Sequence, residues 1–149
     1  MIAYAKTPIG FWMKAEFDGF VLVRLQWQNV DFKGAIENPD LNHYLNCWFE
    51  QLPYTTFHSA KLEGTHFQKK VWSALECIPW GETRTYGEIA EQIGSPRAQQ
   101  AVGQACKKNP LPLLIPCHRV IGQNQSMIGY FGLEHVDIKM LLLDWERTR

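Results

Sequence analysis

The first half of the chain carries two hydrophobic patterns, one typical of strands and one typical of a helix. Hydrophobic residues partly alternate with polar ones over 11–17, and a second apolar run covers 20–27. Between them, Asp18-Gly19 is a hairpin turn signal. Segment 39–51 has hydrophobic residues at helical spacing, at positions 41, 44, 45 and 48. This half therefore predicts a small α/β unit of strands and one helix, followed by loop and a short strand over 52–64.

The second half is predicted to be mostly helical, with helices over 66–78, 86–93, 96–107 and about 134–147. Thr65 is placed to cap the first of them. Gly94 ends the second helix, and Ser95 is the predicted N-cap of the third, with Pro96 in its first turn. Two short helices joined by a tight turn indicate a helix-turn-helix, although a plain helical hairpin would give the same pattern.

The segment after this pair of helices cannot continue as a helix. Asn109-Pro110-Leu111-Pro112 breaks the third helix, because proline lacks the amide hydrogen that a helix needs. Leu113-Leu114-Ile115 is predicted to be a short buried extended run that leads into Pro116-Cys117. A soft boundary near Gly64 gives an N-terminal domain over 1–64 and a C-terminal domain over 65–149. The predicted fold class is α+β, within the size range of one compact domain or two small ones for 149 residues.

Charge gives a modest indication of a nucleic-acid partner. The 15 basic and 15 acidic residues cancel, but their distribution is uneven. Between Lys69 and Arg119 there are seven basic residues and four acidic ones. This bias fits a weak, salt-sensitive affinity for DNA, and it fits an ordinary mixed surface equally well.

The remaining composition predicts an intracellular protein without a metal or cofactor. No stretch of about 18 apolar residues could span a membrane, and the N-terminus does not resemble a secretory signal. The four cysteines are therefore expected to be free thiols in a reducing compartment, the cytoplasm or a eukaryotic nucleus. With no CxxC pair and five scattered histidines, we expect no structural zinc site.

Cys117 is the candidate nucleophile, because His118 and Arg119 follow it directly. A thiol with its ordinary pKa of about 8.5 is mostly protonated at neutral pH and needs a base or a positive environment. Adjacent side chains of an extended segment point to opposite faces, so a bridging water or a local turn after Pro116 is required. A carboxylate to orient the imidazole would complete a relay. Glu146 is one candidate, in competition with Glu134, Asp137 and Asp144.

A Cys-His pair alone is a weak signal, since a buried structural cysteine is more common. The surrounding motifs are far more specific. They are Gly81-Glu82-x-x-x-Tyr86-Gly87-x-Ile89-Ala90, Ser95-Pro96-Arg97-Ala98, Ala101-Val102-Gly103-x-Ala105, Asn109-Pro110 through Pro116-Cys117-His118-Arg119-Val120-Ile121, Gly129-Tyr130, and Lys139-x-Leu141-Leu142-x-x-x-Glu146. With these motifs, the chain from Phe67 to Glu146 resembles the O6-alkylguanine-DNA alkyltransferases (the methylated-DNA–protein-cysteine methyltransferase family), which are suicide DNA-repair proteins.

The resemblance implies a role for each catalytic candidate. Cys117 would accept the alkyl group from guanine O6, irreversibly and in a single turnover. His118 would act as a base through a water, and Glu146 would orient it. Asn109 would brace the turn before the active-site segment. Tyr86 would help to rotate the nucleotide out of the stack and donate a proton toward guanine N3.

The resemblance also implies a fold and a partner. A helical, winged helix-turn-helix domain would carry the site, and the N-terminal α/β domain would pack on it. The protein would act as a monomer on the minor groove of double-stranded DNA that contains O6-alkylguanine. O4-alkylthymine is left open as a further substrate. The residues implied to contact the DNA or the base are Tyr86, Arg97, Ala98, Gln99, Gln100, Gly103, Val120 and Phe131.

Two positions depart from the family pattern. Gln100 stands where an arginine usually fills the gap left by the flipped base, so weaker DNA binding or slower flipping is expected. Arg97, one turn earlier, could contact a phosphate. Phe131 stands where a small residue is common, so it either narrows the pocket or packs in the core. The other three cysteines, Cys47, Cys77 and Cys106, are expected to be small buried hydrophobes.

Three other functions compete with DNA alkyl transfer. An alkyltransferase-like protein would bind the lesion with impaired transfer, but such proteins lack the reactive cysteine that Cys117 provides. A Cys-His hydrolase would need an oxyanion hole, and no glycine-rich or helix-N-terminal signal surrounds Cys117. A helix-turn-helix transcription factor would usually need a dimerisation helix, which the sequence does not show.

Overall fold

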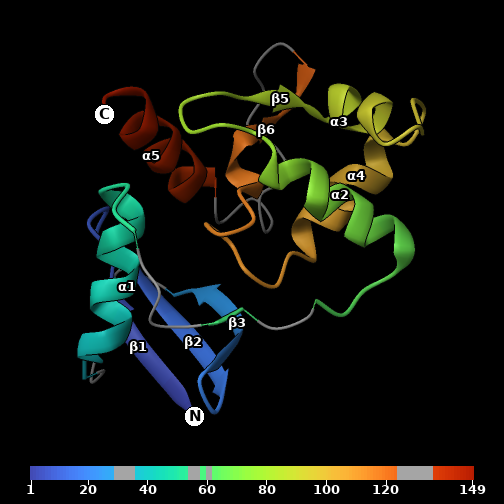
Figure 1. Ribbon diagram of the computed structural model, residues 1–149. Helices are drawn as coiled ribbons and strands as arrows, with labels where there is room; N and C mark the ends of the chain where they lie inside the picture. Colours follow the sequence, from blue (N-terminus) through green and yellow to red (C-terminus); the bar gives the residue numbers. More distant parts are fainter. Residues whose placement is uncertain (29–35, 54–57, 60–61, 124–135) are drawn as a thin grey trace. The chain divides into compact units, whose positions relative to one another are not determined.

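The computed structural model describes residues 1–28, 36–53, 58–59, 62–123 and 136–149 (Figure 1). The chain divides into two compact units, Met1–Lys61 and Leu62–Arg149. The predicted α+β fold class is confirmed by the strands of the first unit and the helices of the second.

The N-terminal unit is a sheet with one helix. Its strands are β1 (Ile2–Lys6), β2 (Trp12–Asp18), β3 (Val21–Trp27) and β4 (His58–Ser59), and its helix is α1 (Pro39–Phe49). The strands follow the order β1-β2-β3-β4, with antiparallel pairing from β1 to β3 and a parallel β3–β4 pair. Gly19 has a φ of +61°, which suits the predicted hairpin turn. Figure 1 shows α1 lying beside β1.

Helix α1 begins and ends for local reasons. The Asn38 side chain accepts a hydrogen bond from the Leu41 amide at 3.0 Å, and proline follows at the first helical position. The helix ends at Phe49, two residues before the predicted end, because Gln51 has a φ of +56° and leaves the helical conformation. The inward face carries Leu41, Tyr44, Leu45 and Trp48, the positions that predicted the helix.

The C-terminal unit is built from short helices around a small parallel strand pair. In chain order it contains α2 (His66–Glu76), β5 (Arg84–Thr85), α3 (Tyr86–Gln92), α4 (Gln99–Lys107), the 3-10 turn η1 (Cys117–Arg119), β6 (Val120–Ile121) and α5 (Val136–Arg147). Thr65 caps α2 as predicted, in a capping box with Gln68. The Trp72 indole donates to the Ala105 carbonyl at 2.9 Å and ties α2 to α4.

The turn between α3 and α4 differs from the prediction. Ser95 is not the N-cap, because α4 begins at Gln99 after Ala98, which makes no side-chain capping bond. The Ser95 carbonyl instead accepts a hydrogen bond from the Ala98 amide at 2.9 Å. Pro96 therefore occupies the second position of a tight turn, a place that suits its fixed φ as well as the first turn of a helix does.

The segment before the candidate nucleophile also differs from the prediction. Residues 113–115 are buried or partly buried, as expected, but they are not extended. The Ile115 amide donates to the Leu111 carbonyl at 2.9 Å, and Leu113 has a φ of +76°. The chain therefore folds back on itself in a turn between Asn109 and Cys117.

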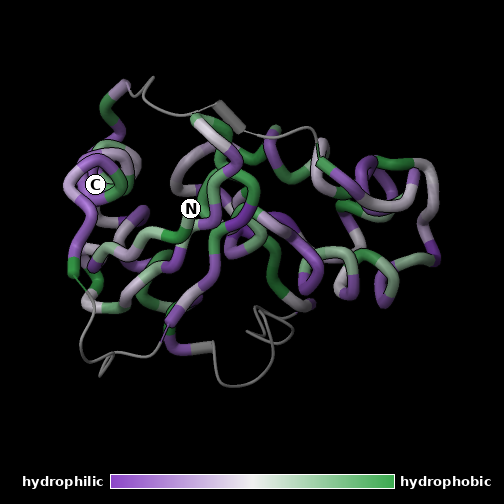
Figure 2. Tube along the Cα trace, turned by 90° about the horizontal axis from the view of Figure 1, so that it is seen from below, coloured by the Kyte–Doolittle hydropathy of each residue, from purple (hydrophilic) through white to green (hydrophobic). Residues whose placement is uncertain are grey.

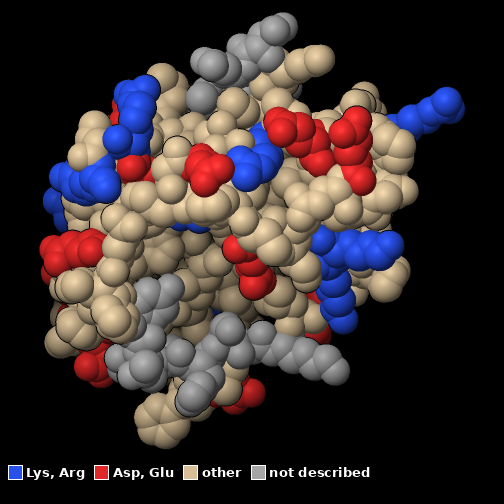
Figure 3. Space-filling view, turned by 45° about the horizontal axis from the view of Figure 1, so that its top comes forward, with Lys and Arg blue, Asp and Glu red and all other residues tan. Residues whose placement is uncertain are grey.

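The described surface is mixed in hydropathy and charge. Hydrophobic and hydrophilic residues alternate in short stretches along the Cα trace (Figure 2). Acidic and basic side chains are interspersed on the face shown in Figure 3. Among the described residues, none of the helices has both the length and the apolarity needed to cross a membrane.

Candidate active site

Cys117 lies in a local turn directly after Pro116. Residues Cys117–Arg119 form η1, in which the Arg119 amide donates to the Pro116 carbonyl at 2.9 Å. In this turn, adjacent side chains no longer point to opposite faces as they do in an extended chain. A local turn after Pro116 was one of the two arrangements, besides a bridging water, that would let His118 act on Cys117. The Cys117 side chain is buried, with 1% of its surface exposed.

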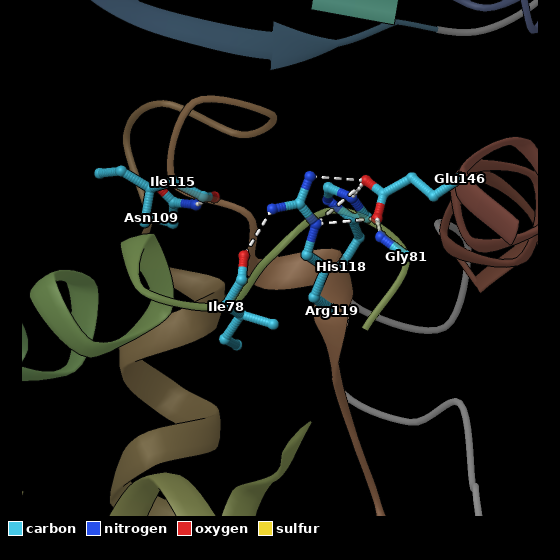
Figure 4. Close-up of polar contacts among 7 residues, drawn as sticks. All are labelled: Ile78, Gly81, Asn109, Ile115, His118, Arg119 and Glu146. Carbon is cyan, nitrogen blue, oxygen red and sulfur yellow. Dashed lines mark hydrogen bonds and ion pairs between the residues drawn. The ribbon is translucent and has the colours of Figure 1, made fainter. Parts of the chain in front are cut away.

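Asn109 connects the turn to the nucleophile. Its Nδ2 group donates to the Ile115 carbonyl at 2.7 Å (Figure 4) and to Cys117 Sγ at 3.1 Å. Its Oδ1 atom accepts from the Leu111 amide at 2.9 Å. The resemblance implied the bracing role, but the direct contact with the sulfur was not predicted. An N–H aimed at sulfur favours the thiolate over the thiol.

Helix α5 brings Glu146 to His118. The distance between His118 Nε2 and Glu146 Oε2 is 2.5 Å, and both side chains are buried. Because an ionised carboxylate can only accept, Nε2 is assigned as the donor, which places the basic lone pair of a neutral imidazole on Nδ1. Of the competing acids, Asp144 pairs instead with Arg147, and Glu134 lies outside the described residues.

Arg119 holds the same carboxylate from a second direction (Figure 4). Its Nε and Nη2 groups donate to Glu146 at 2.8 and 2.9 Å, and its Nη1 group donates to the Ile78 carbonyl at 2.8 Å. The Gly81 amide adds a hydrogen bond of 3.2 Å to Glu146 Oε1. The guanidinium faces the carboxylate rather than the sulfur, as expected of a structural hydrogen-bonding residue.

The electrostatics of the site define its resting protonation. Burial raises the pKa of Cys117 to about 12, although the Asn109 hydrogen bond and the charge of Lys139 act in the opposite direction. Burial also lowers the pKa of His118. Glu146 is buried too, but hydrogen bonds from His118 and Arg119, together with the guanidinium charge, outweigh that effect and lower its pKa to about 2. At neutral pH the site therefore holds a neutral thiol, a neutral imidazole and a carboxylate.

A surface hollow of about 450 Å³ lies over α3 and α4. It brings together several residues that the sequence assigned to DNA or base contact, namely Tyr86, Gln99, Gln100 and Gly103, and it also includes Lys107. Gly103 faces Tyr86, since a Cβ atom there would lie 3.9 Å from the tyrosine ring, in ordinary van der Waals contact.

Other predicted site residues lie elsewhere. Arg97 and Ala98 line a separate shallow hollow at the turn before α4. Val120 is buried in β6, next to η1. Phe131 lies outside the described residues. Of the remaining cysteines, which are free thiols, Cys47 and Cys106 are buried as predicted, whereas the prediction for Cys77 was wrong because it is exposed at the end of α2.

Sequence reasoning missed the position of Lys139. This residue belongs to the matched motif, yet no role was assigned to it. Its side chain is fully buried, and Nζ donates to the Tyr86 hydroxyl oxygen at 3.4 Å. The sequence could have indicated this burial, because Lys139 lies between Ile138 and Leu142, which both face the core from α5.

Comparisons with known proteins identify relatives of this chain. Residues 66–148 match the protein-family model described as 6-O-methylguanine DNA methyltransferase, DNA binding domain. The constitutive methylated-DNA–protein-cysteine methyltransferase of Bacillus subtilis is 42% identical over 96% of this chain and 93% of its own length. A methylated-DNA–protein-cysteine methyltransferase of Mycobacterium bovis is 52% identical over 79% of this chain and 67% of its own.

Solved structures support the same assignment across both units. The crystal structure of the Mycobacterium tuberculosis O6-methylguanine methyltransferase matches all of this chain and 94% of its own, with a TM-score of 0.80 and 36% identity. A Mycobacterium tuberculosis structure in complex with DNA matches 97% of this chain and 92% of its own, with a TM-score of 0.78 and 38% identity. The chain belongs to the methylated-DNA–protein-cysteine methyltransferase family, whose members include these relatives.

Proposed function

We propose that this protein repairs DNA by moving the alkyl group of O6-alkylguanine, with methyl as the reference case, onto Cys117 in a single irreversible turnover. The observation that carries the proposal is the geometry around the sulfur. Cys117 Sγ accepts a hydrogen bond from Asn109, and the adjacent His118 is held by the buried carboxylate of Glu146. A thiol, a neutral base and an orienting acid are the groups that nucleophilic transfer requires.

The proposed reaction moves one carbon and balances its protons. His118 takes the thiol proton through a bridging water, and the Cys117 sulfur attacks the methyl carbon. The S–C bond forms as the bond between O6 and that carbon breaks, and the electron pair stays on the guanine. Tyr86 donates a proton toward N3 of the leaving base. The thioether is stable, so the protein is consumed.

Burial of the nucleophile protects it until DNA arrives. With a pKa raised to about 12, Cys117 is nearly all thiol in the free protein at neutral pH. Its 1% exposure also keeps oxidants from the sulfur. Entry of the base must displace neighbouring atoms, and the relay would then deprotonate the thiol next to its substrate.

Delivery of the base is assigned to the helix-turn-helix. Chemistry on the edge of a stacked base requires the nucleotide to rotate out of the duplex, at a cost of a few kcal/mol. We propose that α4 enters the minor groove of the DNA and that Gln100 fills the gap in the stack. Arg97 would contact a phosphate, supported by the half-buried Ala98 at the N-cap of α4 and the exposed Gln99 at its first position. A single copy of the chain suffices for these contacts.

The remaining contacts are proposed for the pocket itself. The backbone carbonyls of Cys117 and Val120 would accept hydrogen bonds from the exocyclic amine of guanine. The backbone amide of Phe131 would donate to O6. Both assignments rest on the family resemblance, and the burial of Val120 next to η1 is compatible with the first.

A stoichiometry experiment tests the proposed function. The protein is incubated with excess duplex DNA that carries O6-[labelled methyl]guanine, and the label bound per protein is measured over time. We expect a plateau at one methyl group per chain. Cys117→Ser should abolish transfer while DNA binding is retained, and Cys77→Ser, the same change at an exposed thiol, should transfer normally. Repeated turnover, or transfer by the Cys117→Ser protein, would contradict the proposal.

A further inference from the structure

The exposed side of α4 carries amide side chains at helical spacing. Gln100 and Gln104 are four residues apart, and Lys107 follows three residues later, so all three lie on one side of the helix. Each of them is exposed, whereas Val102 and Ala105 are buried on the other side. Along its length, the exposed side of α4 therefore presents two neutral amides and then a single cation.

The hollow over α3 and α4 contains both glutamines together with Tyr86. Of the described residues around this hollow, Lys107 alone carries a formal charge. Within the described part of the chain, neither glutamine side chain has a hydrogen-bond partner, so both amides can bind a ligand. The hollow therefore suits a partner with neutral donors and acceptors, such as the edges of bases, next to the phosphate that Lys107 would contact.

The minor groove of DNA offers an amide a choice between base pairs. An A·T pair presents only acceptors there, adenine N3 and thymine O2, whereas a G·C pair adds the 2-amino donor of guanine. A glutamine side chain has both an NH2 donor and a carbonyl acceptor. It can therefore bond to N3 and to the 2-amino group of one guanine together, but it can only donate to an A·T pair. A lysine on a phosphate makes no such distinction.

The spacing of the two glutamines determines which base pair Gln104 would meet. Four residues of α-helix rise by about 6 Å, and stacked base pairs are about 3.4 Å apart. With Gln100 in the gap left by the flipped base and α4 lying along the groove, Gln104 reaches a pair about one or two steps away. It is thus close to the lesion without touching the damaged base.

We propose that Gln104 reads the base pairs next to the lesion in the minor groove and favours G·C over A·T. Its Nε2 group donates to guanine N3, and its Oε1 atom accepts from the 2-amino group of the same guanine. No covalent bond changes in this contact, so it affects the encounter with DNA rather than the chemistry at Cys117. This inference rests on the proposed function and adds a specificity-determining residue to it.

The sequence around the lesion provides the test. Three duplexes carry O6-methylguanine between neighbouring pairs that are G·C, A·T or inosine·C, since inosine pairs with cytosine but lacks the 2-amino group. Initial rates of methyl transfer are measured below saturating DNA for the wild type and Gln104→Leu. Because these pairs also change duplex stability, the preference for G·C over inosine·C is compared between the two proteins. We expect the wild-type preference to be larger by about fivefold or more, as for loss of one bidentate contact with a base.

Gln92→Leu is the matched control, because Gln92 is exposed at the end of α3 and does not line the hollow. This variant should keep the wild-type preference, and the A·T duplex should behave like the inosine·C duplex in all three proteins. An equal preference in the wild type and Gln104→Leu would overturn the inference, as would the same loss in both variants. A plateau of one methyl per chain without any preference would leave the proposed function intact, whereas no transfer to any duplex would overturn that function itself.

Discussion

Replacement of Lys139 by methionine should make the protein more stable at neutral pH. Methionine has nearly the same length as lysine and fills the same space without a charge. The ordinary pKa of lysine is 10.5, and burial lowers that of Lys139 to about 8. Each unit of pKa corresponds to about 1.4 kcal/mol, so keeping this ammonium charged in the native state costs about 3 kcal/mol.

The cost has a defined pH dependence. Below pH 8 the lysine is protonated in both the native and the unfolded state, so the full penalty applies. As pH rises from about 8 to 10.5, the native protein has already lost the proton while the unfolded chain still holds it, and the penalty shrinks. At about pH 9.5 linkage predicts that about 1.4 kcal/mol of it is left.

Urea unfolding of wild type and Lys139→Met at pH 7 and at about pH 9.5 measures both quantities. The free energy of unfolding of the variant should exceed that of the wild type by about 3 kcal/mol at pH 7 and by about half that amount at the higher pH. A variant that is less stable than the wild type by the same amount at both pH values would show that the contact with Tyr86 stabilises the fold and that the ammonium carries no penalty.

Three further variants test the turn before Cys117 and the proposed DNA contacts of α4. Asn109→Ala removes hydrogen bonds to the Ile115 carbonyl and from the Leu111 amide, so the free energy of unfolding should fall by about 2–3 kcal/mol; an unchanged urea midpoint would contradict this. Lys107→Gln should reduce the slope of log affinity against log salt for duplex DNA by about 0.9, the value for one phosphate contact. Its neighbour Lys108, which does not line the hollow over α3 and α4, gives the matched control, and equal slope changes would disprove the assignment. Gln100→Arg should raise the repair rate on duplex DNA, and an unchanged rate would exclude a role for this position in base flipping.

The helices of the C-terminal unit could be predicted because each carries a clear 3.6-residue pattern and local end signals. Thr65 caps α2 with both bonds of a capping box, which depends only on residues within one turn. The start of α4 could not be placed in the same way. Pro96 fits the first turn of a helix and the second position of a tight turn equally well, and only the contacts of the neighbouring helices decide between them.

The parts of the site that depend on tertiary folding were the least predictable. A run of three hydrophobic residues, 113–115, has no period, so its burial could be predicted but its turn could not. The bond from Asn109 to Cys117 Sγ exists only because that turn brings residues eight positions apart together. Lys139 shows a conflict between two rules, since helical spacing places it inside while its charge argues for the surface. The relay partner Glu146 was one of several acids in the sequence, and the position of α5 selects it.

Arg119 explains why this relay can be buried without unfolding the site. An isolated buried carboxylate would take up a proton or cost several kcal/mol. The guanidinium and the Gly81 amide saturate Glu146 and keep its pKa low, at about 2. The carboxylate therefore stays ionised at neutral pH, and His118 keeps one fixed tautomer. The same buried cluster should make the native protein sensitive to acid. Below the ordinary glutamate pKa of 4.5, Glu146 binds a proton in the unfolded chain but stays ionised in the native protein, so falling pH favours unfolding.

Peptide mapping of the labelled protein identifies the cysteine that accepts the methyl group. After reaction with DNA that carries O6-[labelled methyl]guanine, the protein is digested and each of the four cysteine-containing peptides is weighed by mass spectrometry. We expect the peptide with Cys117 to gain one methyl group and the peptides with Cys47, Cys77 and Cys106 to gain none. Label on Cys106, the other buried thiol of the C-terminal unit, or label on no cysteine at all, would contradict this expectation.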